Sequence, residues 1–359
     1  TCTANITNNL SNRNLIINGA MQVAQRGTSA TNIGTTGTFV VDRFLVSNVT
    51  GTAVQTATQE NDAPAGFYNS LKVTCTTADT DYSTDDQSKI EYRIEGKDIQ
   101  RLNFGTANAK TLGVSFYVKS NKTGNTAIGL VNSANDRSFV HQFTIASANT
   151  WQRVSFTVAG DTSGTWLVDT NIGMRLRWGT FGTNFQTSTL DAWQAGQKMA
   201  TSNSPINFNA ATNDYLQITG VQLEVGSVAT DFEHRSFGQE LALCERYCQA
   251  VLDGSDANNS GQHDIVGHTY TASNIFLIPR TRTKMRAAPS IFTKTGAFYY
   301  NAFSQGSSVY FDSIGLDRSS TNSATITVTT PSGGSIAQGL PCFVRTNNTN
   351  AKILLTSEL

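Results

Sequence analysis

The chain has 359 residues, of which 38% are hydrophobic and only 14% charged, and its 26 basic and 26 acidic side chains cancel to a net charge of zero. This balance provides no basic face for nucleic acid, and no apolar run approaches the roughly 20 residues that span a bilayer. Thr, Ser, Asn and Gly fill the rest, which favours strands with polar outer faces and many turns. An all-β secreted or virion-type protein fits this composition.

The chain has five cysteines at irregular spacings, and an odd number cannot all pair within one chain. Reduced, buried thiols fit this pattern. We therefore expect synthesis in a cell's cytoplasm rather than passage through an oxidising secretory route. The five cysteines are Cys2, Cys75, Cys244, Cys248 and Cys342.

The first predicted strands flank a turn. Residues 14–29 hold two short apolar runs on either side of Asn18-Gly19, a pair that favours the positive backbone angles of a hairpin turn. After a loop rich in Gly and Thr, residues 38–47 are predicted to form another strand.

The middle of the chain predicts half-buried antiparallel strands. Residues 111–120, 151–158 and 171–179 alternate apolar and polar side chains, so one face of each strand is apolar. Residues 215–226 also alternate, but the apolar set shifts by one position at Gly220, where a β-bulge would restore it. Two sheets packed face to face account for this pattern better than one open sheet.

Residues 236–252 predict the one clear helix. Ser236 and Gln239 form a capping-box pattern at its start. Five apolar residues then build a heptad seam about two repeats long. The seam residues are Phe237, Leu241, Cys244, Cys248 and Val251. Because so short a helix is unstable alone in water, we expect either three copies packed around an axis or packing on its own sandwich.

Cys244 and Cys248 could also supply two zinc ligands from one helix face. A zinc site needs a second pair, and only His234 lies nearby in sequence. Since free cysteines are usually buried, helix packing is the favoured interpretation.

No catalytic motif is recognisable. The sequence has no Gly-x-Ser-x-Gly elbow, no zinc-protease histidine pair and no phosphate-binding glycine loop. Carboxylate pairs for glycoside cleavage would come from residues distant in sequence, and nothing identifies them. We expect a protein that is not an enzyme and has no catalytic residues.

An acidic loop at residues 79–86 gathers four carboxylates: Asp79, Asp81, Asp85 and Asp86. A hard cation such as Ca²⁺ prefers several oxygens from one loop. The loop lacks the spacing and the closing Glu of an EF-hand, so a solvated turn is the alternative. Beyond this Ca²⁺, no cofactor is expected.

Glycan binding without cleavage requires exposed aromatic faces beside polar neighbours. Trp166, Trp193 and Tyr215 lie in or beside polar segments and are the glycan-binding candidates. Trp151 and Trp178 lie within predicted strands, where core packing is the alternative to glycan binding, and the sequence does not decide between the two.

Four segments together resemble known proteins. "NLIINGAMQVAQRGTS" (14–29) resembles the opening of jelly-roll carbohydrate-binding modules, and "YLQITGVQLEVGSVATDFEHR" (215–235) resembles their closing strand. Followed by "SFGQELALCERYCQ" (236–249) and "IPRTRTKMRAAPSIF" (278–292), the order resembles tail-fibre-like structural proteins of tailed bacteriophages, especially marine and cyanobacterial ones.

This resemblance implies a homotrimeric virion appendage, made in the host cytoplasm, whose jelly roll precedes a smaller terminal β-domain that contacts the host surface. It carries no catalytic residues over. The expected organisation is an N-terminal connecting segment (1–13), a jelly-roll sandwich (14–235), a helical joint (236–252) and a C-terminal β-domain (253–359).

The expected function is that of a tail fibre or receptor-binding appendage on the virion. It would attach to other virion proteins through residues 1–13 and adhere to host-surface polysaccharide or lipopolysaccharide, without nucleic acid or a membrane span. The first alternative is a capsid fibre or decoration protein on the head. A polysaccharide depolymerase is the third expectation.

Overall fold

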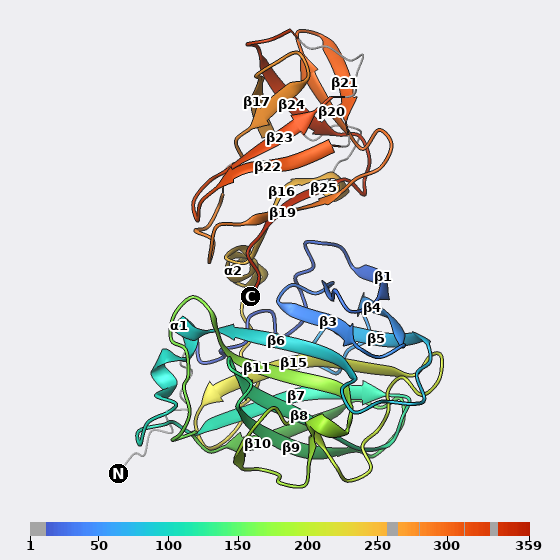
Figure 1. The fold of residues 1–359 in the computed structure, drawn as a ribbon, viewed down its shortest axis with the longest axis vertical. Helices are drawn as coiled ribbons and strands as arrows, with labels where there is room; N and C mark the ends of the chain where they lie inside the picture. Colours follow the sequence, from blue (N-terminus) through green and yellow to red (C-terminus); the bar gives the residue numbers. More distant parts are fainter. Residues whose placement is uncertain (1–11, 257–264, 280, 312, 331–336) are drawn as a thin grey trace. The chain divides into compact units, whose positions relative to one another are not determined.

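The computed structural model describes residues 12–256, 265–279, 281–311, 313–330 and 337–359 (Figure 1). The predicted connecting segment 1–13 therefore lies almost wholly outside the described residues. The chain divides into two compact units, Thr1–Glu240 with Leu359 and Leu241–Glu358. This division falls inside the helix that follows the first unit's last strand.

Six strands form one sheet of the first unit, called the A sheet. In spatial order they are β1 (Ser29–Ile33), β4 (Val54–Glu60), β5 (Ser70–Thr77), β15 (Tyr215–Val225), β7 (Leu112–Ser120) and β10 (Gln152–Val158).

Seven strands form the other sheet, the B sheet. In spatial order they are β13 (Trp193–Ala195), β9 (Arg137–Ile145), β8 (Gly124–Asn132), β11 (Ile172–Phe181), β6 (Gln87–Glu95), β3 (Phe44–Val49) and β2 (Thr38–Phe39). The connecting segments contain the short elements α1 (Gly96–Ile99), η1 (Gln100–Leu102), η2 (Thr183–Phe185), β12 (Gln186–Thr187) and β14 (Ala200–Thr201).

The A and B sheets pack face to face as a jelly-roll β-sandwich, which confirms the predicted all-β fold. Every strand pair in both sheets is antiparallel. The late strand β15 inserts between β5 and β7. One apolar core fills the space between the sheets, with Phe116, Ile218 and Trp178 among its buried side chains. The alternating pattern of the sequence thus marks which face of each strand is buried.

The predicted bulge in β15 is confirmed. Its register with β7 shifts between Thr219 and Gln222, and Gly220 has a φ of 61°. A Cβ at Gly220 would lie 2.7 Å from the Phe67 ring and 2.9 Å from the Tyr117 ring. Only glycine meets both the backbone conformation and the close approach of the two rings.

The N-terminal strand predictions are partly wrong. The Asn18 turn exists, closed by Met21 N–H donating to Asn18 C=O at 2.9 Å, but regular strand begins only at Ser29. Instead of a ladder, the buried Asn18 side chain donates to the carbonyl of Val23 and accepts from its N–H. The predicted strand 38–47 is split into β2 and β3 by a turn.

The predicted helix is too long. Helix α2 (Phe237–Glu245) ends early, and Cys248 and Val251 lie instead on strand β16 (Cys248–Asp253), which pairs with β25 (Lys352–Thr356). The proposed five-residue helical seam therefore does not exist as one face. The pairing of β16 with β25, a strand about 100 residues further on, overrides the local helical pattern, because tertiary contacts outweigh intrinsic helix propensity.

The start of α2 matches its prediction. Ser236 N–H donates to Gln239 Oε1 at 3.1 Å, and Gln239 N–H donates to Ser236 Oγ at 3.4 Å, which is the reciprocal capping box. Cys75, Cys244, Cys248 and Cys342 are buried, and none of them is in a disulfide within the described residues. These four confirm the prediction of reduced, buried cysteines, and Cys2 lies outside the described residues.

The second unit has two sheets of its own. The first holds three strands, β16, β25 and β19 (Ser290–Lys294), with β25 in the middle. The larger sheet, in spatial order, consists of β21 (Ser307–Phe311), β20 (Tyr300–Ser304), β24 (Pro341–Thr346), β17 (Ile265–Thr269), β18 (Asn274–Leu277), β23 (Ala324–Thr329) and β22 (Ser313–Ser319). The short helix η3 (Gly254–Asp256) follows β16.

The second unit has its own apolar core, which includes Tyr300, Ile326 and Leu355. Within the described residues, none of the helices has the length and apolar character needed to cross a membrane.

Candidate functional site

Four side chains form one row across the outer face of the A sheet. The strand registers place Gln217 of β15 opposite Lys72 of β5 on one side and opposite Lys119 of β7 on the other. Trp151, directly before β10, completes the row, with Lys119 Nζ 5.8 Å from the centre of its ring. The neighbours Val73 and Val118 point into the core, so the row points away from it.

Asp62, in the loop between β4 and β5, binds to this row. Its Oδ1 accepts a hydrogen bond from Trp151 Nε1 at 3.1 Å, and its Oδ2 accepts one from Lys119 Nζ at 2.7 Å. Gln217 Nε2 donates to the Asp62 backbone carbonyl at 3.1 Å. The loop thus places a carboxylate beside the only tryptophan of the row.

The Asp62 carboxylate is charged and accessible. Its side chain is 49% exposed, whereas that of Lys119 is 16% exposed. Partial burial opposes ionisation, but the hydrogen bonds from Lys119 and Trp151 and the charge of Lys119 outweigh it and lower the pKa of Asp62. The Trp151 side chain beside it is half-buried. A partly exposed ring next to a fixed carboxylate, an amide and two lysines can hold a polyhydroxylated ligand.

The predicted candidate Tyr215 lies next to the row but offers no free ring face. Lys72 Nζ lies 4.6 Å from the centre of its ring, and its hydroxyl donates to Asn149 Oδ1 at 2.8 Å. Burial, together with the negative charge of Asp62, raises the pKa of the Tyr215 hydroxyl. Tyr215 therefore lies beside the row on the same face of β15 and packs against Lys72.

The predicted candidates Trp166 and Trp193 come together, but as packing residues. Trp166 is only 8% exposed, and its ring meets that of Trp193 edge to face at 5.2 Å. Both rings also pack edge to face on Phe104, and Trp193 Nε1 donates to the carbonyl of Ala159. The expectation of an exposed platform does not fit Trp166, since an aromatic cluster at the edge of the core covers it.

The sequence left open whether Trp151 is a core residue, and the structure places it on the outer face. The alternation of buried and exposed residues along β10 indicates this outward direction. Val154 and Val158 are buried, so Trp151 falls on the odd-numbered face together with the exposed Arg153. Trp178, the other tryptophan within a predicted strand, is buried in the core.

The acidic loop makes turn contacts. Asp79 Oδ2 accepts from Thr52 N–H at 2.8 Å, Asp86 Oδ2 from Ser83 N–H at 2.7 Å, and Asp85 Oδ1 from Asn184 Nδ2 at 2.8 Å. Asp81 is exposed. Across the described ranges, no three His, Cys, Asp or Glu side chains are grouped to hold a metal ion. Ca²⁺ binding by this loop stays a prediction.

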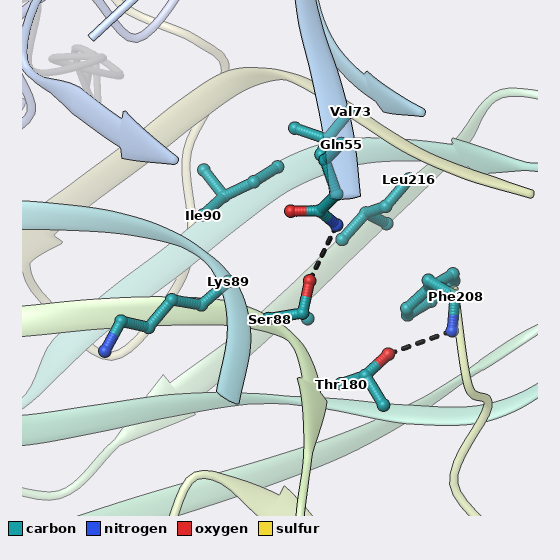
Figure 2. A pocket seen from close by; sticks show the side chains of 9 residues that line it. Gln55, Val73, Ser88, Lys89, Ile90, Thr180, Phe208 and Leu216 are labelled. Atoms are coloured by element: carbon teal, nitrogen blue, oxygen red, sulfur yellow. Dashed lines mark hydrogen bonds between the residues drawn. The ribbon is translucent and has the colours of Figure 1, made fainter. Parts of the chain in front are cut away.

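A small cavity lies within the sandwich (Figure 2). Its volume is about 10 Å³, which is room for one water molecule and not for a sugar. Gln55 Nε2 donates to Ser88 Oγ at 2.6 Å, and Phe208 N–H donates to Thr180 Oγ1 at 2.9 Å, beside this cavity. A sugar therefore does not fit into this cavity.

The fold and the outer-face row define an all-β protein with a jelly-roll sandwich as its first unit. No family model matches the sequence, and no curated protein matches it. Among solved structures, the enzymatically active domain of tailspike protein 4 of bacteriophage CBA120 is 12% identical, with a TM-score of 0.33. That match covers 60% of this chain and only 22% of the tailspike chain.

Two carbohydrate-binding modules of Clostridium thermocellum are similar as well. The C-terminal family 22 module of the Xyn10B protein is 11% identical over 58% of this chain and 100% of the module, with a TM-score of 0.29. The family 11 module of a cellulosomal cellulase is 12% identical over 52% of this chain and 90% of the module, with a TM-score of 0.27. At these scores the likeness carries no argument about what this chain binds.

Proposed function

We propose that this protein is a virion structural protein of a tailed phage, a tail fibre or receptor-binding appendage that adheres to host-surface glycans. The observation that carries the glycan-binding part is the Trp151 ring fixed beside the exposed Asp62 carboxylate. The apolar C–H face of a sugar packs on an aromatic ring, and its hydroxyls donate to a carboxylate. The binding site is the outer-face row with Asp62.

The virion part of the proposal rests on the sequence resemblance to tail-fibre-like proteins. The reduced cysteines agree with assembly in a host cytoplasm. A trimer would present three copies of a weak glycan site, and such multivalency strengthens attachment by about 10²–10⁴.

An apolar row in the second unit supports self-association. Val266 of β17 lies opposite Phe343 of β24, which in turn lies opposite Phe303 of β20. Val266 and Phe343 are both exposed, at 57% and 46%. Neighbouring exposed apolar side chains on one sheet face are typical of an interaction surface, and a second copy of this chain is the partner we propose.

Two measurements test the function. The full chain is first screened for binding to host-surface polysaccharides; binding to one of them supports adhesion, and no binding to any contradicts it. Gold-labelled antibody imaging of intact particles then locates the chain. Label on the tail supports the receptor-binding appendage, label over the head makes it a capsid fibre or decoration protein, and no label on any particle contradicts the virion assignment.

A further inference from the structure

The outer face of the B sheet carries a compact charged cluster on strands β6 and β11. Their register places Arg93 directly opposite Arg175, and Glu91 directly opposite Arg177. Lys89 precedes Glu91 by two residues and shares its face. The intervening Tyr92 and Leu176 belong to the core, so all five charged side chains point away from it.

Positive charge exceeds negative charge in this cluster. Glu91 pairs with Arg93, Arg177 and, at 3.9 Å, with Lys89, so one carboxylate faces four cationic side chains when Arg175 is included. Like charges directly opposite one another in a sheet repel, which is the position of Arg93 and Arg175.

Burial and neighbouring positive charge both act on the pKa values of two cations in the cluster. Burial lowers the pKa of Lys89 to about 8, with the charge of Arg177 as the next cause. Burial and then the charge of Arg177 lower the pKa of Arg175 to about 10. In both groups burial is the larger cause and the positive charge of Arg177 adds to it, so a bound anion would favour their charged forms.

Arg93 and Arg175 are the partly exposed arginines of the cluster, whereas Arg177 and Glu91 are buried. Arg175 binds the carbonyls of Asn132 and Ser133 through Nη1 alone, and within the described part of the chain its Nε and Nη2 have no hydrogen-bond acceptor. Arg177 Nη1 donates only to the Met199 sulfur at 2.9 Å, a weak acceptor. Arg93 binds Glu91 and the main-chain oxygen of Leu359, and its side chain is still 26% exposed.

We infer that this cluster is a second glycan site, selective for sugars that carry an oxyanion such as a carboxylate, and that Arg93 and Arg175 contact the anion. Planar guanidinium groups match the geometry of carboxylate, sulfate and phosphate oxygens. Glu91 acts as a positioning residue, because its carboxylate accepts hydrogen bonds from Arg93 Nε and Arg177 Nε. This inference rests on the proposed glycan-binding function and narrows its ligand to acidic polysaccharides.

Calorimetric titration of the full chain tests the site. The ligands are polygalacturonate oligosaccharides, which carry a carboxylate on each sugar, and neutral galactan oligosaccharides of the same length. We expect the acidic ligand to bind more tightly, with an affinity that falls as salt rises. Arg175→Gln should weaken binding of the acidic ligand about tenfold and leave the neutral ligand unchanged. The matched control is Arg101→Gln, which removes an exposed arginine of the same unit outside the cluster.

Arg175 also donates to two backbone carbonyls, so Arg175→Gln changes the structure as well as the charge. Lys89→Gln is therefore a second variant, which removes the repulsion between the Lys89 ammonium and Arg177. A bound anion raises the pKa of Lys89, so binding near pH 8 should take up protons and its measured enthalpy should depend on the buffer. Lys89→Gln should abolish that dependence, which a purely structural role would not produce.

The outcomes separate this inference from the proposed function. If the wild type binds neutral glycans as well as acidic ones, or if Arg175→Gln behaves like Arg101→Gln, the anion site is wrong and glycan adhesion stands. If the wild type binds neither polygalacturonate nor galactan nor any host polysaccharide, the proposed function itself fails. Acidic preference with the expected losses supports both.

Discussion

Asp62 and Trp151 are separated by 89 residues, and a 3.1 Å hydrogen bond from the indole to the carboxylate joins them on the outer face of the A sheet. Trp151→Ala removes both the ring and this donor. We expect at least about a tenfold weaker affinity for the glycan found in the screen, since an aromatic contact and a charge-assisted hydrogen bond are lost together.

Asp62→Asn should weaken glycan binding in the same direction and leave the fold intact. Asp191→Asn is the matched control, because Asp191 is a similarly exposed carboxylate that accepts a bond from His141 at 2.6 Å away from the row. Equal affinities of Asp62→Asn and Asp191→Asn in calorimetric titration would show that the row is not the glycan site.

Ionisation of Glu91 makes the stability of the first unit depend on pH in the acidic range. Burial opposes ionisation of Glu91, but Arg177, Arg93 and Lys89 outweigh it and lower its pKa to about 2 from 4.5. A depressed carboxyl pKa contributes stability above pH 4.5 that is lost as the pH falls toward 2. Glu91→Gln should lose about 3–5 kcal/mol of unfolding free energy at pH 7, because it leaves the buried Arg177 without its carboxylate partner.

The measurement is denaturant unfolding followed by tryptophan fluorescence. All four tryptophans lie in the first unit, so the signal reports that unit alone. The difference between wild type and Glu91→Gln should shrink as the pH falls from 4.5 toward 2. A difference that stays constant over this range would contradict the ionic role of Glu91.

Protonated Lys89, unlike ionised Glu91, lowers the stability of the first unit. Its folded pKa of about 8 lies below the ordinary 10.5, so the protonated ammonium destabilises the fold below pH 8, and stability rises between pH 8 and 10.5. Lys89→Met should therefore stabilise the first unit by about 1–3 kcal/mol at pH 7. The same fluorescence assay should find that this gain shrinks above pH 8, whereas a less stable variant at pH 7 would refute the argument.

The bulge of β15 depends on its glycine. Gly220→Ala places a Cβ within 3 Å of the Phe67 and Tyr117 rings at a φ of 61°. The backbone conformation alone should cost about 1–3 kcal/mol of unfolding free energy, and the ring contacts should add to that loss. Gly66→Ala separates the two causes, because Gly66 also has a positive φ of 91° but open space around its Cβ position. It should cost about 1 kcal/mol, and equal losses in the two variants would exclude the ring contacts as a cause.

Self-association should depend on the apolar row of the second unit. Phe343→Glu places a charge in this row and should lower the mass measured by sedimentation equilibrium to that of one chain. Val168→Glu, at an exposed valine of the first unit, is the control. If Leu241→Asp dissociates the assembly and Phe343→Glu does not, helix α2 makes the interface; a wild type that is monomeric contradicts the trimer.

The strands of the sandwich could be predicted from sequence because each buries one face. Residues 111–120, 151–158 and 171–179 became β7, β10 and β11, and the shift at Gly220 marked a true bulge. A period of two is a local signal, and burial on one side enforces it.

Features that depend on distant partners could not be predicted in this way. Cys248 carries a helical pattern, yet it pairs with Thr356 of β25 and joins a sheet. The candidate site shows the same limit. The turn residues around Asp62 do not indicate that their loop folds back over β15 and β7, although the outward direction of Trp151 was readable from its strand.

The position of β15 has a consequence for how the chain reaches its native state. Before residues 215–225 pair with β5 and β7, the A sheet consists of two separate parts, β1-β4-β5 and β7-β10, each with an unpaired edge. Closing the sheet requires contacts over long stretches of chain, which slows folding. During synthesis, the two open edges are exposed to other nascent chains until β15 emerges from the ribosome, so the first unit should fold late and depend on chaperones at high expression.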